Sequence, residues 1–191
     1  MTCPNVDTEY PGLAYLCPLD EIIVTQARDA LHDIIGDRAR ISYTIFNNRG
    51  QKIFIAVRIK GCRKFTIKVY NIYGNEVIEV RRPFALCVNR VLVWAPPGNF
   101  VGSVKQLCNK YAVTNDSGVK VLNIRIQRPL KLIYNIRYVC GVEPIGVIKQ
   151  HWDLPQVGGV KNFGVSFPVQ LNVQDKAVLL GACFLIGCLK Y

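Results

Sequence analysis

The sequence lacks the patterns that several common protein classes require. Its eight cysteines are scattered and include no C-x-x-C pair, which argues against a zinc site and against the dense disulfide framework of small secreted domains. It has only two histidines, so a nucleophilic pair of Cys140 with His151 is not favoured. No low-complexity tract is present, and the first 20 residues hold acids and prolines instead of an apolar run. We therefore expect no signal peptide, and free thiols in a reducing cytosol.

Acidic residues are also scarce, with 13 Asp and Glu against 24 Lys and Arg, for a formal net charge of +11. Residues 1–37 carry seven acids and one base, which leaves the remainder of the chain at about +17. Such a field attracts polyanions, and charge alone does not distinguish anionic lipid headgroups from nucleic acid. A basic protein without a polyanionic partner fits the same composition.

One segment near the start of the chain has helical spacing. Residues 20–36 place apolar side chains three and four positions apart, with Asp20 suited to cap the beginning and Gly36 to close the end. This spacing predicts an N-terminal amphipathic helix.

From Arg40 onward the apolar residues alternate with a period of two, which is typical of β-strands. Five pairs of such runs flank turn-forming residues, and their glycines recur every 20 to 24 positions, at Gly50, Gly74, Gly98, Gly118 and Gly141. Successive hairpins must close or stack to hide their edge strands. The pattern predicts a mainly β protein with a closed antiparallel barrel of about ten to twelve strands.

The segment 177–189 contains 13 residues without a charge. As a helix it would be roughly 20 Å long, whereas the hydrocarbon core of a bilayer is about 30 Å thick. Gly181 and Gly187 keep such a helix slim, so it could fill the lumen of the barrel, and a membrane span is the alternative. We expect a short leader over residues 1–18 and a barrel domain over residues 19–191, with this buried helix at 175–190.

Four ordered motifs resemble those of the phospholipid scramblase family, and we expect a member without the proline-rich leader that many others have. The motifs are PGLAYL at 11–16, APPG with VGSVKQ at 95–106, IGVIKQHWD at 145–153, and NFGVSFPVQLNV followed by KAVLLGACFLI at 162–186. The resemblance implies a tubby-like barrel around a hydrophobic C-terminal helix, at the cytosolic face of the plasma membrane or an internal membrane. It also implies ATP-independent, bidirectional movement of phospholipids between leaflets, which involves no bond chemistry and no catalytic nucleophile.

Two other functions remain open. The chain could be a tubby-like module that binds anionic lipid or a protein partner without transporting anything, or it could bind nucleic acid through its basic surface. On lipid or on nucleic acid we expect phosphate groups to be contacted by basic residues interleaved with aromatic ones, and the ordinary alternative is a solvated strand face. The candidate contact residues are Arg58, Lys60, Arg63, Lys64, Lys68, Arg81 and Arg82.

The resemblance implies a calcium segment that is rich in aspartates on both sides of Asn-Phe-Gly. Calcium prefers several anionic oxygens at about 2.4 Å. In this sequence the pattern is kept at Asn162, Phe163 and Val165, whereas the acidic positions are occupied by Gly159, Lys161, Gln170 and Asn172. These replacements argue against a calcium ion and predict a calcium-independent protein.

The cysteine cluster that carries palmitate in the family is reduced here to Cys87, next to Arg81, Arg82 and Arg90. One acyl chain beside basic residues is sufficient to hold a protein on an anionic bilayer. Cys87 is therefore a candidate acylation site, and an ordinary barrel cysteine is the alternative.

Overall fold

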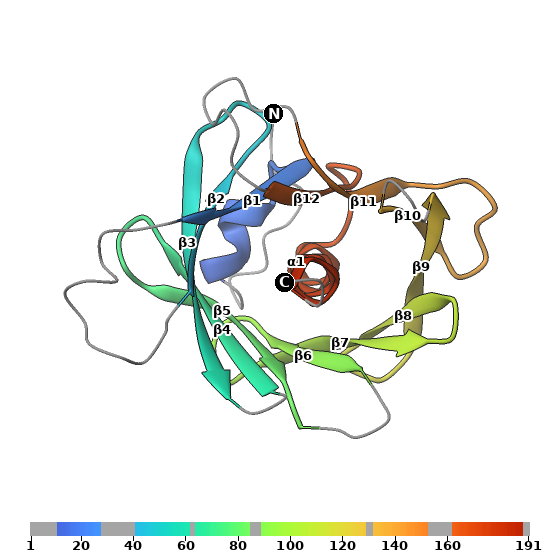
Figure 1. Ribbon diagram of the computed structural model, residues 1–191, viewed down its shortest axis with the longest axis horizontal. Coiled ribbons are helices and arrows are strands. Elements are labelled where there is room, and N and C mark those ends of the chain that lie inside the picture. Colours follow the sequence, from blue (N-terminus) through green and yellow to red (C-terminus); the bar gives the residue numbers. More distant parts are fainter. Residues whose placement is uncertain are drawn as a thin grey trace.

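The computed structural model describes residues 11–27, 41–61, 64–84, 89–128, 132–152 and 162–188, and it contains a closed barrel of twelve antiparallel strands around one α-helix (Figure 1). This confirms the predicted fold class. The strands are β1 (Glu21–Ala27), β2 (Ile41–Phe46), β3 (Lys52–Gly61), β4 (Lys64–Asn71), β5 (Glu76–Arg82), β6 (Arg90–Trp94), β7 (Phe100–Leu107), β8 (Lys110–Asn115), β9 (Lys120–Arg128), β10 (Ile133–Tyr138), β11 (Gly146–Gln150) and β12 (Asn162–Ser166).

Each strand pairs with its neighbours in the sequence, and β1 pairs with β12 to close the barrel. The five predicted hairpins are present as β2–β3, β4–β5, β6–β7, β8–β9 and β10–β11. Three of their turns begin with an asparagine whose side-chain oxygen accepts the backbone N–H four residues later: Asn47, Asn71 and Asn115. Because alternate connections of an up-and-down barrel share one end, all five turns lie together. We call this the turn end and the opposite one the far end.

The predicted N-terminal amphipathic helix is wrong over Glu21–Ala27, which form strand β1. Ile22, Ile23, Val24 and Thr25 are all β-branched, and their restricted side chains favour strands over helices. Hydrogen bonding to β12 on one side and β2 on the other then satisfies both edges of the segment. Residues 28–36 of the predicted helix lie outside the described residues.

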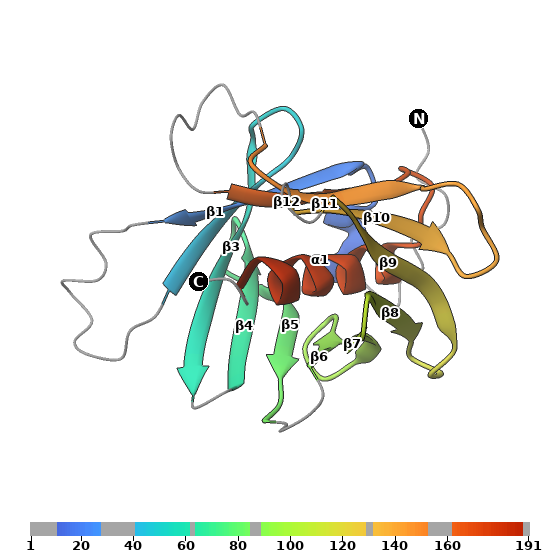
Figure 2. The same ribbon diagram turned by 45° about the vertical axis from the view of Figure 1, so that its right-hand side comes forward.

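The uncharged segment forms helix α1 (Val173–Cys188), which runs through the lumen of the barrel (Figures 1 and 2). Its side chains from Ala177 to Ile186 are at most 4% exposed, which confirms the prediction of a buried helix. Gly181 is needed where α1 approaches β6, because a Cβ atom there would lie 2.6 Å from Val93 Cγ2. Among the described residues, no helix is both long enough and apolar enough to cross a membrane.

A short 3-10 helix, η1 (Pro11–Leu16), lies inside the barrel beside α1 (Figure 1). Leu13 and Leu16 are fully buried in the core, although both fall in the segment predicted as a leader. Lys176, in the first turns of α1, is fully buried as well. The core thus includes chain that precedes the first strand.

The expectation of free thiols fails at Cys17, which is buried and disulfide-bonded. Cysteine spacing does not show which pairs a fold brings together, and this is why the sequence missed the bond. Cys108 and Cys140 are free and exposed.

Candidate functional site

The described phosphate-contact residues lie on the three adjacent strands β3, β4 and β5, most of them toward the far end. Because side chains alternate between the two faces of a strand, residues that are close in this sequence need not share a surface. Arg63 and the side chain of Lys60 lie outside what the structure describes. Lys64 is exposed at the start of β4.

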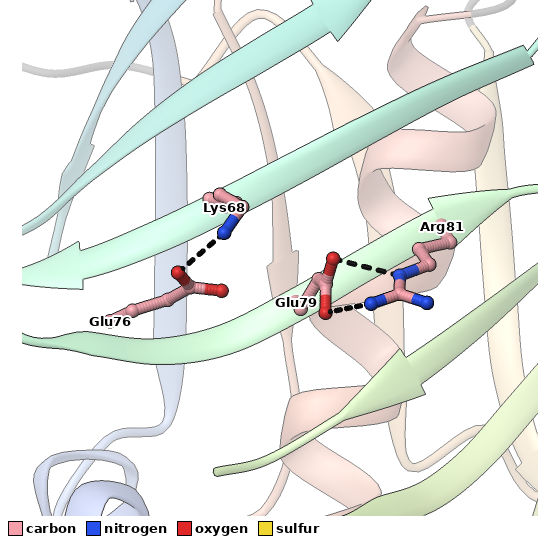
Figure 3. A network of polar contacts seen from close by, with 4 residues as sticks. All are labelled: Lys68, Glu76, Glu79 and Arg81. Atoms are coloured by element: carbon pink, nitrogen blue, oxygen red, sulfur yellow. Dashed lines mark hydrogen bonds and ion pairs between the residues drawn. The ribbon is translucent and has the colours of Figure 1, made fainter. Parts of the chain in front are cut away.

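Lys68 and Arg81 lie on the outer face of the barrel, and each is paired with a carboxylate of β5 (Figure 3). Lys68 Nζ is 2.8 Å from Glu76 Oε2, and this hydrogen bond raises the pKa of Lys68. Arg81 donates two hydrogen bonds, of 2.8 and 2.7 Å, to the buried carboxylate of Glu79, which raises the pKa of Arg81. Its guanidinium also lies 4.7 Å from the centre of the Trp94 ring. Both charges are therefore compensated within the protein.

Arg58 and Arg82 instead accompany Phe65, whose ring belongs to the buried core. Their guanidinium carbons lie 4.8 Å and 6.0 Å from the centre of that ring. Phe65 is opposite Arg82 in the β4–β5 ladder, near the far end of the barrel. The sequence cluster thus separates into an outer pair and an inner pair.

Of the inner pair, Arg58 has hydrogen-bonding capacity left over. Arg82 Nε donates to Asn89 Oδ1 at 2.8 Å, and the Asn89 amide donates to Gln106 Oε1 at 2.8 Å. Arg58 Nε is buried and has no hydrogen-bond partner among the described residues. A buried guanidinium N–H without an acceptor is unfavourable, and a phosphate oxygen is an acceptor that matches its charge.

The motif IGVIKQHWD holds the outer face of β12 in place. Trp152 covers Gly164, where a Cβ atom would lie 2.7 Å from the indole nitrogen. Trp152 N donates to Asn162 Oδ1 at 2.6 Å, and Asn162 Nδ2 donates to the Trp152 carbonyl at 2.9 Å. Lys149 Nζ lies 4.2 Å from the centre of the indole ring. This motif joins the end of β11 to β12, so two of the recognised motifs are structurally one unit.

Comparison with known proteins agrees with these motifs: the family model described as Scramblase matches residues 1–191. The chain belongs to the scramblase family. It is 32% identical to phospholipid scramblase 2 of Bos taurus over 97% of this chain and 71% of that protein. It is 29% identical to human phospholipid scramblase 1 over 97% of this chain and 65% of that protein. It is 31% identical to human phospholipid scramblase family member 5 over 92% of this chain and 75% of that protein.

The segment that the scramblase resemblance links to calcium is spread along β12 and the loop after it. Phe163 and Val165 are buried in the barrel core, and the Asn162 side chain is engaged by Trp152. Gln170 and Asn172 are exposed in the chain beyond the other end of β12, a strand about 17 Å long. Asn172 Oδ1 accepts the Gln174 N–H at the start of α1. Gly159 and Lys161 lie outside the described residues.

Across the described ranges, no group of three or more His, Cys, Asp and Glu side chains is arranged to hold a metal ion. Cys140 lies between β10 and β11 at the turn end, whereas His151 follows β11 at the far end, so a strand separates the two candidates for a nucleophilic pair. Cys87, the candidate acylation site, lies outside the described residues.

Sequence reasoning missed the arrangement of four basic residues that β6 to β9 bring together on the outer face of the barrel. Arg90 is directly opposite Lys105, and Lys110 is directly opposite Arg125. Partners in each pair are 15 positions apart in the chain, so they do not form a basic run. Counting outward from the turn glycines would have placed them opposite each other.

Proposed function

We propose that this chain moves phospholipids between the leaflets of a membrane, in both directions and without ATP. The observation that carries this proposal is the match of the scramblase family model over residues 1–191, together with relatives whose names are phospholipid scramblases. No bond is made or broken in such a process, so the proposal needs no nucleophile. It needs a surface that lowers the energy of a polar headgroup in hydrocarbon.

The path for headgroups, on this proposal, does not run through the barrel. Helix α1 occupies the lumen and its buried side chains pack on the inner faces of the strands. Close packing of this kind leaves no polar channel. The headgroup therefore follows the exterior and the far-end rim of the barrel, where polar and charged side chains are accessible.

Within the predicted contact set, we propose that Arg58, Arg82 and Lys64 make the main phosphate contacts. Arg58 and Arg82 bring two guanidiniums to one ring near the far end, and Lys64 is exposed at the same end. Lys68 and Arg81 are second in rank, because Glu76 and Glu79 already neutralise them. Lys60 and Arg63 are adjacent in the chain and complete the set. The protein acts at the cytosolic face of its membrane, where anionic lipids attract basic proteins.

The activity is expected to be independent of calcium. This follows from the loss of acids at the family's calcium segment, where Gly159, Lys161, Gln170 and Asn172 offer no carboxylate. The response of the activity to calcium therefore tests whether the loss of these acids removes calcium dependence.

The experiment is a transport assay on reconstituted vesicles that carry a fluorescent phospholipid in both leaflets. Dithionite destroys the fluorescence of the outer leaflet only, so an active protein lets the signal fall well below one leaflet's worth. We expect that fall at equal rates with added calcium and with a chelator. Fluorescence that stops at one leaflet's worth under both conditions would reject transport and leave a non-transporting lipid-binding module.

A further inference from the structure

The far end of the barrel carries two cross-strand pairs of like charge. In the β6–β7 ladder Arg90 is directly opposite Lys105, and in the β8–β9 ladder Lys110 is directly opposite Arg125. Arg90, Lys105 and Arg125 are exposed and Lys110 is half-buried. All four occupy the outer face, because the inward positions of these strands are held by core residues such as Val91, Val104 and Ile124. We call these four residues the basic belt.

The belt weakens the isolated barrel, because like charges directly opposite each other in a sheet repel. In the described part of the chain, the two ion pairs involve Lys68 and Arg81, and neither touches the belt. The described acids lie instead in the turn-end half or at the middle of a strand: Asp20, Glu21, Glu76, Glu79, Asp116, Glu143 and Asp175. Among the described residues, the acids therefore lie away from the belt.

Apolar side chains accompany the cations at this end. Phe84, just after β5, is 55% exposed, and Ile59, in the far half of β3, is 44% exposed. Leu107 is half-buried opposite Lys110 on the outer face. Contact with phosphates is energetically favourable for the cations, whereas transfer into the boundary between headgroups and acyl chains is favourable for the apolar side chains. Only a bilayer surface supplies both, since the backbone of a nucleic acid offers phosphates alone.

We propose that the basic belt docks this protein on an anionic phospholipid bilayer, with the far end of β6–β9 facing the membrane. This inference rests on the proposed function, for which it supplies the orientation of the barrel. It also places the inner pair, Arg58 and Arg82, at the same end as the headgroups.

The turn end is the competing surface, because Tyr73 and Val142 are 73% and 78% exposed at its loop tips. Acids accompany these loops, however. Glu143 follows Val142 directly, and Asp116 lies in the β8–β9 turn. An anionic surface repels these carboxylates, so the far end is the better match.

The test compares two full-length double variants that lose the same charge from opposite ends. Lys105→Gln with Arg125→Gln removes one cation from each belt pair, and Lys52→Gln with Lys120→Gln removes two exposed cations at the turn end. Binding is measured by co-sedimentation with phosphatidylcholine vesicles, with and without phosphatidylserine. The belt variant should bind the anionic vesicles about 25-fold more weakly, at about fivefold for each cation.

The charge-matched variant should stay within about twofold of the wild type. The melting temperature of the belt variant should equal or exceed that of the wild type, because repulsion has been relieved. A belt variant that binds like its matched control overturns the proposal. A greater loss of vesicle binding in the double variant Tyr73→Ser with Val142→Ser also overturns it. The same holds if the belt variant loses binding to duplex DNA but not to anionic vesicles.

The two proposals fail in different ways. A wild-type protein that binds anionic vesicles through the belt but leaves dithionite protection intact refutes transport and keeps the docking surface. A protein that scrambles lipid, and whose belt variant binds as tightly as the control, refutes the docking surface and keeps transport.

Discussion

The ammonium nitrogen of Lys176 lies 2.8 Å from the carbonyl oxygen of Leu19, a residue 157 positions earlier in the chain. The same nitrogen is 3.1 Å from the Leu16 carbonyl, 2.8 Å from that of Cys17 and 2.8 Å from that of Val169. These carbonyls end or follow the short helix η1 or precede α1, and the lysine is fully buried among them. One side chain thus joins the start of the central helix to the chain that leads into the barrel.

Replacing Lys176 by Met should lower the free energy of unfolding by about 3 kcal/mol, because the buried carbonyl oxygens of Leu16, Cys17 and Leu19 lose their donor. Urea denaturation followed by circular dichroism measures the change. Lys120→Met, which removes an exposed lysine, is the matched control and should shift the midpoint little. Equal effects of the two substitutions would contradict the structural role of Lys176.

Burial lowers the pKa of Lys176 to about 8, and the nearby charge of Asp20 opposes part of that shift. The unfolded chain keeps this proton up to about pH 10.5, so between pH 8 and 10 it binds more protons than the folded chain. The free energy of unfolding should therefore rise with pH across this window, by up to about 3 kcal/mol.

Denaturant titrations at pH 8, 9 and 10 measure this slope, and Lys176→Met should abolish it. Above pH 10 the trend should reverse, because burial raises the pKa of the Tyr111 phenol to about 12 and the unfolded chain loses that proton first. A slope that survives in Lys176→Met would assign the effect to another group.

Gly181→Ala should destabilise the protein by about 1–3 kcal/mol, although alanine is the better helix former. The added methyl group would lie 2.6 Å from Val93 Cγ2 on β6. Combining it with Val93→Ala makes room, so the double variant should lose less stability than the sum of the single variants. Thermal denaturation of all four proteins in the cycle measures this coupling. Strict additivity would mean that the helix does not press on β6 at this point.

Arg58→Gln should weaken binding to phosphatidylserine vesicles about fivefold, because no carboxylate among the described residues neutralises the Arg58 guanidinium. Lys68→Gln removes the same charge from a residue that Glu76 already neutralises, so its effect should be less than about twofold. Co-sedimentation of both variants with phosphatidylserine vesicles shows which substitution weakens binding more. A larger loss for Lys68→Gln would reverse the assignment of inner and outer contacts.

Most of the barrel could be predicted from its turns, because glycines at Gly50, Gly74, Gly98 and Gly118 adopt the positive φ that tight turns require. Strand β1 could not. Its neighbouring residues Ile22 and Ile23 are both buried, so the strand does not alternate and its apolar positions also fit a helix.

The candidate contact residues stay a prediction, and the sequence does not show which of them share a surface. Basic residues from Arg58 to Arg82 are visible in the sequence. The face of the sheet on which each side chain lies depends on the alternation along each strand and on an irregularity in register between Val69 and Tyr70. The buried lysine escaped notice for a related reason. At the edge of an apolar run, Lys176 has the pattern of a solvated flank, and carbonyls from a distant segment are what make its burial tolerable.

The helix that fills the barrel follows all twelve strands in the chain, and the first strand pairs with the last. During synthesis the hairpins can form one after another, but each presents its apolar face to water until α1 has left the ribosome. Nascent chains with exposed apolar surface and unpaired strand edges are prone to aggregate. This protein should therefore require chaperone protection until translation is nearly finished, and most of its stability should be gained in one late step.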